Sequence, residues 1–153
     1  MQKKISKYFY FSVCFAFFVF LTLYLSDFIV SQLLHGFSYS NAVFSLNYVE
    51  NTGAAFSLLK DSRELLIIVS VAAICAIIGY IMKNVSRISM KAIFFLSMLS
   101  AGIGGNLHER IALGFVRDYI QLNFIDFPVF NISDIFINIG VIAIIIMLLK
   151  KNL

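Results

Sequence analysis

The fold is decided by the stretch Gly114-Phe-Val-Arg-Asp-Tyr-Ile-Gln-Leu-Asn-Phe-Ile-Asp-Phe-Pro-Val-Phe-Asn-Ile-Ser-Asp134. A mainly apolar run, residues 135–149, follows it directly. We therefore expect Asp134 to open a helix that enters a membrane, and Asp118 to lie near the end of the preceding helix. A carboxylate beside hydrocarbon is energetically expensive and marks a functional site by default. Two carboxylates that meet could share a proton and activate a water molecule.

The composition is that of a membrane protein. Of the 153 residues, 61% are hydrophobic and only 13% are charged, whereas a soluble domain is about half apolar and about a quarter charged. We expect one compact domain over residues 1–153. Cys14 and Cys75 both lie in apolar runs, which argues against a disulfide framework. His35 and His108 stand alone, so we expect no metal site and no cofactor.

Four apolar segments are long enough to cross the hydrocarbon core of a bilayer. We predict spans at residues 8–25, 64–82, 92–110 and 132–149. The first is expected to be a retained helix that ends near Ser26 and Asp27, because no small-residue cleavage site follows it. The third carries small residues that let helices approach closely, namely Ser97, Ser100, Gly102, Gly104 and Gly105.

Residues 31–63 have a different character. Apolar and polar residues partly alternate over Ala42–Val49, which favours a strand. Asn51-Thr-Gly53 is typical of a turn, and the apolar run Ala54–Leu59 follows. We predict a small β-containing, extracytoplasmic cap that lies on the membrane surface.

The charges predict the orientation. The N-terminus, the loop between the second and third spans and the C-terminus hold eight of the 12 basic residues and none of the acidic ones. The positive-inside rule places such segments in the cytoplasm, so both termini are expected there and the acids at the outer face. The eight are Lys3, Lys4, Lys7, Lys83, Arg87, Lys91, Lys150 and Lys151.

Helical spacing groups the polar residues. Asn131, Asp134 and Asn138 share one face of the fourth helix, and Asn106 and Arg110 share a face of the third. The first turn of a helix favours an ionised Asp134. Arg110 could neutralise or hold a carboxylate. Asparagine side chains could donate to the carbonyl groups of a substrate.

The carboxylate pair Asp118 and Asp134 indicates general acid and general base catalysis on a peptide bond. No serine or cysteine has a paired histidine in a plausible place. Two alternatives remain at this point, a small four-helix proton-coupled transporter and a non-catalytic membrane scaffold. A transporter predicts an acid near the middle of a span. The other acids away from the motifs are interpreted as helix ends and loops, namely Asp27, Asp61, Glu64 and Asp126.

Four segments resemble those of the lipoprotein signal peptidase family (signal peptidase II), which are integral-membrane aspartic proteases. In order along the chain they are Asn47-Tyr-Val-Glu-Asn-Thr-Gly-Ala-Ala-Phe-Ser57, Gly104-Gly-Asn-Leu-His-Glu-Arg110, Gly114-Phe-Val-Arg-Asp-Tyr-Ile120 and Phe130-Asn-Ile-Ser-Asp134. The resemblance covers essentially the whole chain. Five residues depart from the family's usual pattern: Phe28 replaces glutamine, Ser31 lysine, Glu109 aspartate, Ser133 alanine and Phe127 tryptophan.

The resemblance implies the function and the site. The substrate would be a prolipoprotein whose cysteine carries diacylglycerol, cleaved just before that cysteine. Asp118 and Asp134 would be catalytic, and the supporting, substrate-binding residues would be Asn51, Asn106, Arg110 and Asn131. Expected partners are that precursor, membrane lipid and globomycin-type inhibitors, with no nucleic acid. The expected location is the bacterial cytoplasmic (inner) membrane, with the site at the extracytoplasmic face.

Overall fold

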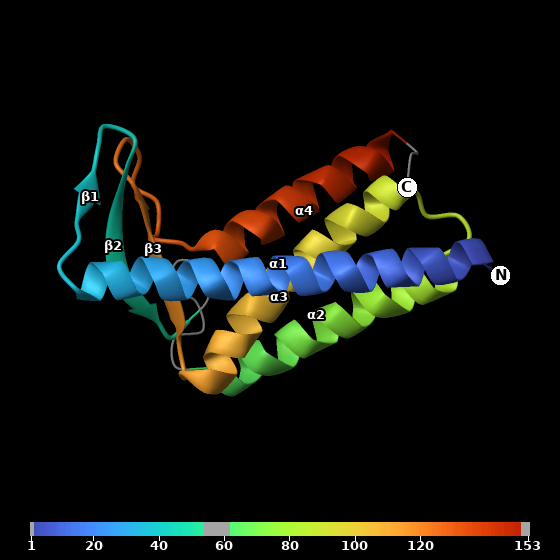
Figure 1. Cartoon of the computed structure of the whole chain (residues 1–153), viewed down its shortest axis with the longest axis horizontal. Helices are drawn as coiled ribbons and strands as arrows, with labels where there is room; N and C mark the ends of the chain where they lie inside the picture. Colours follow the sequence, from blue (N-terminus) through green and yellow to red (C-terminus); the bar gives the residue numbers. More distant parts are fainter. Residues whose placement is uncertain (1, 54–61, 151–153) are drawn as a thin grey trace.

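The computed structural model describes residues 2–53 and 62–150. Within these residues, four helices form a bundle, and three strands form an antiparallel sheet in the order β1-β2-β3 at one end of it (Figure 1). The start of α1, the loop between α2 and α3, and the end of α4 lie at the opposite end. The bounds are α1 (Gln2–Leu34), β1 (Tyr39–Ser40), β2 (Phe44–Asn51), α2 (Arg63–Asn84), α3 (Met90–Ala112), β3 (Val116–Leu122) and α4 (Ile132–Leu149).

This architecture confirms the predicted fold class. All four helices are long and apolar enough to cross a membrane. The helices contain three of the predicted spans, at residues 64–82, 92–110 and 132–149, and α1 extends beyond 8–25 at both ends. The limits of the membrane itself stay a prediction. The predicted β-containing cap is present as β1 and β2, while its apolar run Ala54–Leu59 lies outside the described residues.

The centre of the bundle is α3, which packs against α1, α2 and α4. In the apolar 18-residue stretch of α3, 56% of the residues are buried, against 22% for α1 and 11% each for α2 and α4. Glycine makes its contact with α4 close, because a Cβ atom at Gly102 would lie 2.5 Å from the carbonyl oxygen of Ser133. A Cβ atom at Gly140 would lie 2.8 Å from the Cβ atom of Leu99. Small residues thus let these two backbones approach, as in other membrane bundles.

The expected end of the first helix near Ser26 and Asp27 is wrong. The helix continues to Leu34 and is followed by Gly36, whose φ of 90° suits a residue without a side chain. Ser26 and Asp27 do not break the helix, because their side chains bind β3 instead. The added turns carry α1 past β2 and β3, and residues 31–34 of the predicted cap belong to the helix.

The expected position of Asp118 near the end of a helix is also wrong. Helix α3 ends at Ala112, and Asp118 lies on β3, which pairs antiparallel with β2. Val49 is the register partner of Asp118, and the register shifts between Leu46 and Val49. The stretch that looks like an aromatic connection is therefore a strand over its first half. The alternation of apolar and polar residues typical of a strand is hard to recognise here, because the buried residue Asp118 is polar and lines a cavity.

Candidate active site

Asp118 is presented by the alternation of side chains along β3. Val116, Asp118 and Leu122 line a cavity of about 800 Å³. The neighbours of Asp118 in the chain, Arg117 and Tyr119, bind on the other side of the strand. Tyr119 is fully buried, and its hydroxyl group lies 3.1 Å from that of Ser26 on α1.

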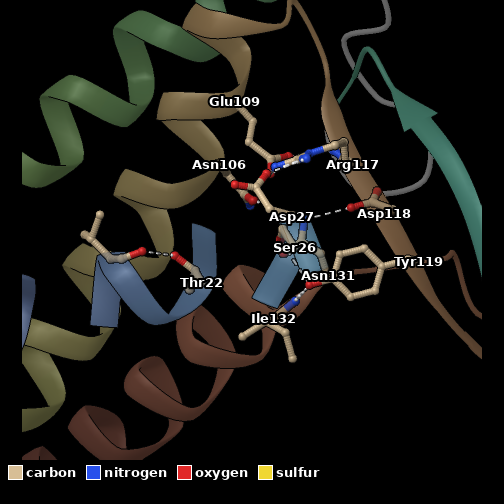
Figure 2. Close-up of polar contacts among 11 residues, drawn as sticks. Thr22, Ser26, Asp27, Asn106, Glu109, Arg117, Asp118, Tyr119, Asn131 and Ile132 are labelled. Carbon is tan, nitrogen blue, oxygen red and sulfur yellow. Dashed lines mark hydrogen bonds and ion pairs between the residues drawn. The ribbon is translucent and has the colours of Figure 1, made fainter. Parts of the chain in front are cut away.

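The carboxylate of Asp118 is buried and accepts two amide hydrogen bonds. Asn51, at the end of β2, donates to Oδ2 over 2.8 Å. Asn131 donates to Oδ1 over 2.8 Å (Figure 2). Only 3% of the Asp118 residue surface is exposed. Two elements on either side of β3 therefore fix both oxygens.

Asp134 is held by the N-terminus of α4. Asn131 is the N-cap of this helix, and its side-chain oxygen accepts from the backbone N–H of Asp134 over 3.0 Å. Asp134 Oδ2 accepts in return from the N–H of Asn131 over 3.1 Å, which completes a capping box. Asp134 Oδ1 accepts from the side chain of Asn106 on α3 over 2.8 Å.

The two aspartates are connected through asparagines. The amide nitrogen of Asn131 that binds Asp118 also donates to Asn106 Oδ1 over 3.1 Å, and Asn106 in turn binds Asp134. Both carboxylates line the same cavity, together with Asn51, Asn106 and Arg110. Asn131 is 2% exposed and supports this arrangement from behind the cavity wall. The structure thus brings together all six residues that the sequence predicts for the site.

Arg110 acts on the two aspartates through its charge rather than through a direct contact. Its guanidinium group donates to the carbonyl oxygen of Gly53 over 3.0 Å and to that of Asn106 over 3.4 Å. Within the described residues, it forms no ion pair with a carboxylate. Arg110 therefore ties the chain beyond β2 to α3, next to Asn51, and lines the cavity beside the carboxylates.

Burial changes the acidity of Asp118. Desolvation is the largest cause and the charge of Asp134 the second, and together they raise the pKa of Asp118 from its ordinary value to about 7. The amide hydrogen bonds from Asn51 and Asn131 act in the opposite direction. A carboxyl group with this pKa can hold a proton near neutral pH. The arrangement therefore has the chemistry that acid and base catalysis by a carboxylate pair requires.

An ion-pair cluster that the sequence did not predict lies behind Asp118. Arg117 binds Glu109 of α3 over 2.7 Å and Asp27 of α1 over 2.8 Å (Figure 2). The available signal was the placement of an arginine directly before the predicted catalytic aspartate. Asp27 comes from a helix far away in the chain, and Glu109 lies eight residues before Arg117 across a turn, so neither pairing follows from helical or strand spacing.

The fold and the cavity define a class of protein, a multi-pass membrane protein with a pair of carboxylates in a cleft at one end of its bundle. Two solved structures have the same fold, and both are described as bacterial membrane enzymes studied by the in meso method. One, at 2.3 Å resolution, has a TM-score of 0.81 and 28% identity and covers 92% of this chain and 88% of its own. The other, at 1.9 Å, has a TM-score of 0.80, 29% identity and 92% coverage of both chains.

Sequence comparison gives the family. The model described as signal peptidase (SPase) II matches residues 8–150. A lipoprotein signal peptidase of Streptococcus thermophilus is 39% identical over 110 residues, which are 72% of this chain and 71% of that protein. One of Streptococcus agalactiae is 36% identical with the same coverage. The chain belongs to the signal peptidase II family and is a membrane-embedded peptidase. The predicted resemblance is confirmed.

Proposed function

We propose that this protein is an aspartic endopeptidase that removes signal peptides from prolipoproteins carrying a diacylglyceryl cysteine, and that it cleaves just before that cysteine. Membership of the signal peptidase II family supports signal-peptide removal from lipoproteins. The observation that carries the aspartic mechanism is the convergence of Asp118 and Asp134 on one cavity through Asn131 and Asn106.

The reaction needs no covalent enzyme intermediate. One aspartate is ionised and takes a proton from a water molecule, whose oxygen attacks the scissile carbonyl carbon. The other aspartate is protonated and donates to the carbonyl oxygen, which gives a tetrahedral diol. When the diol collapses, the C–N bond breaks and the leaving nitrogen takes up a proton from the pair. The two carboxyl groups titrate as a coupled pair, so the roles belong to the dyad.

The cavity has walls suited to a lipid-linked peptide. Polar groups gather around the carboxylates, whereas Phe127, Pro128, Phe130 and Ile137 give it an apolar side. Amide and carbonyl groups at one side can bind an extended peptide, and the apolar side can take up acyl chains. The site is proposed to face the outer leaflet of the bacterial cytoplasmic membrane, with both termini in the cytoplasm.

The transporter alternative predicts an acid near the middle of a span. Within the described helices, Glu64 and Asp134 lie in first turns, Glu109 lies near the end of α3 and Asp27 lies beside β3. The acids gather at the end of the bundle that carries the sheet and the cavity, which favours a peptidase over a transporter.

The test is cleavage of a lipid-modified precursor by the purified protein. Asp118→Asn and Asp134→Asn are each expected to lower turnover by roughly 10³-fold or more, because neither variant retains a complete acid–base pair. Asp126→Asn is the matched control, since Asp126 is an exposed acid of the connection between β3 and α4. A globomycin-type peptide is expected to block the parent and the control alike. Normal turnover by either dyad variant would contradict the aspartic mechanism.

A further inference from the structure

We propose that Arg117 is a positioning residue, which fixes the backbone that carries Asp118 by binding Glu109 at the back of β3. This inference rests on the proposed function, because it concerns how the same dyad is held in place. Figure 2 shows Arg117 before and Tyr119 after Asp118 along the strand, with Glu109 and Asp27 close to the arginine.

Glu109 binds both the main chain and the side chain of Arg117. Its Oε2 accepts from the backbone N–H of Arg117 over 2.7 Å. Its Oε1 accepts from Nε over 3.0 Å and from Nη2 over 2.7 Å. The side chains of Arg117 and Glu109 are 15% and 5% exposed. A single buried carboxylate therefore anchors the residue next to Asp118 through three charge-assisted hydrogen bonds.

Glu109 lies on α3, the helix that also binds Asp134 through Asn106. Asn106, which binds Asp134, and Glu109 are three residues apart on α3 and so lie on neighbouring positions of one helix face. One rigid element is thus connected to Asp134 through Asn106 and to Asp118 through the pair of Glu109 and Arg117. Helix α3 therefore contributes to the separation of the two carboxylates through both connections, beside the direct hydrogen bond from Asn131 to Asp118.

Asp27 is the outer partner of Arg117 and contributes differently. It lies 2.8 Å from Nη1, but its side chain is 70% exposed. An exposed ion pair is screened by water and contributes little, whereas breaking a buried pair leaves an uncompensated charge. The positioning role therefore falls to Glu109. The arginine has one buried and one exposed partner, which supplies an internal control.

The geometry requires arginine rather than any cation. Glu109 Oε1 receives two N–H groups of the guanidinium fork, while a third nitrogen faces Asp27. Lysine keeps the charge but is a point donor on a flexible stem, and it cannot reproduce this planar contact. Arg117→Lys therefore keeps the positive charge behind β3 but loses the planar contact, so it tests the effect of that contact on the position of the β3 backbone separately from the effect of the charge.

The experiment measures kcat, KM and melting temperature for the full chain in detergent, with a lipid-modified precursor as substrate. Arg117→Lys is expected to lower kcat roughly 10- to 100-fold, because displacement of a catalytic group by about 1 Å costs rate on that scale. KM is expected to stay within about twofold, since the loss falls on the reacting groups. Asp27→Asn is expected to keep kcat within about twofold. Glu109→Gln is measured as a single variant as well. The kcat of the double variant Arg117→Lys/Glu109→Gln is expected to be no lower than that of the slower single variant, because the two residues act as a unit.

A second variant covers the case in which Arg117→Lys does not fold. Arg117→Gln/Glu109→Gln leaves no unpaired buried charge, and the same drop in kcat is expected at a temperature well below its melting point. The inference is overturned if Arg117→Lys keeps parental kcat, or if kcat falls only in step with the folded fraction. Equal losses for Asp27→Asn and Arg117→Lys would also overturn it. If the parent protein fails to cleave the precursor, the proposed function fails. If the parent cleaves it, Asp118→Asn does not cleave it and Arg117→Lys cleaves it at the parental rate, only the inference about Arg117 fails.

Discussion

At the scale of single residues, the site depends on opposing effects on one carboxyl group. Burial and the charge of Asp134 raise the pKa of Asp118, and the amides of Asn51 and Asn131 counteract them. The folded-state pKa of about 7 exceeds the unfolded value of about 3.9. The folded protein therefore binds more protons than the unfolded chain between these values. The contribution of Asp118 to stability is fully present below the unfolded pKa and is lost as the pH rises through the folded one.

This sign gives a prediction for thermal unfolding in detergent. The melting temperature of the parent is expected to fall between about pH 4 and about pH 8 as Asp118 ionises inside the protein. Asp118→Asn removes the titrating group, so its fall over the same range is expected to be smaller. Comparing the two pH values within each protein cancels any constant cost of the new amide. An equal fall in both proteins would show that Asp118 does not titrate in this window.

At the scale of elements, close backbone contact between α3 and α4 keeps the asparagine network short. Gly102 faces Ser133 and Ile137 of α4, which are the residue before Asp134 and the residue three positions after it. Asn106 follows Gly102 by one helical turn and binds Asp134 directly. The approach of the two helices therefore determines whether this hydrogen bond can form.

Gly102→Ala tests this contact. The new methyl group would meet backbone atoms that cannot move away cheaply, so a loss of about 1–3 kcal/mol in stability is expected. Turnover is expected to fall as well, because α4 moves away from Asn106. Gly79→Ala is the matched control, since nothing lies within 4 Å of a Cβ atom there. Unfolding curves in detergent and precursor cleavage report both effects, and equal behaviour of the two variants would argue against the close contact.

At the scale of the whole molecule, the arrangement separates two ends of a bundle. The sheet lies at one end, and the loop between α2 and α3 lies at the other (Figure 1). The cavity and the ion-pair cluster are built on β3 and the helix ends next to the sheet. A peptide whose lipid is anchored in the outer leaflet can reach the cavity only if the end with the sheet faces outward. Orientation is therefore part of the proposed mechanism.

Cysteine labelling tests the orientation. In a background with Cys14→Ser and Cys75→Ser, a thiol reagent that cannot cross the membrane is expected to label Ile125→Cys in intact spheroplasts. Ser86→Cys, in the loop between α2 and α3, is expected to react only after permeabilisation. Both positions are exposed in the folded protein, so accessibility differs through the membrane alone. The reverse pattern would place the site in the cytoplasm.

The sequence by itself determined the parts that depend on local composition. Apolar length predicted four helices, and alternation predicted strands in the segment before α2. Polar residues at helical spacing predicted Asn106, Asn131 and Asp134 at the site. These signals are local because hydrocarbon favours continuous apolar helices and penalises isolated polar groups.

Only the tertiary structure decided how these parts meet. It placed Asp118 on β3 rather than at a helix end, and extended α1 past Ser26 and Asp27. It turned Arg110 towards carbonyl groups and paired Arg117 with Glu109. Most of these contacts join segments far apart in the chain, and the energies of all of them depend on burial, which spacing along a sequence does not contain. The proximity of the two aspartates is therefore a property of the packed bundle.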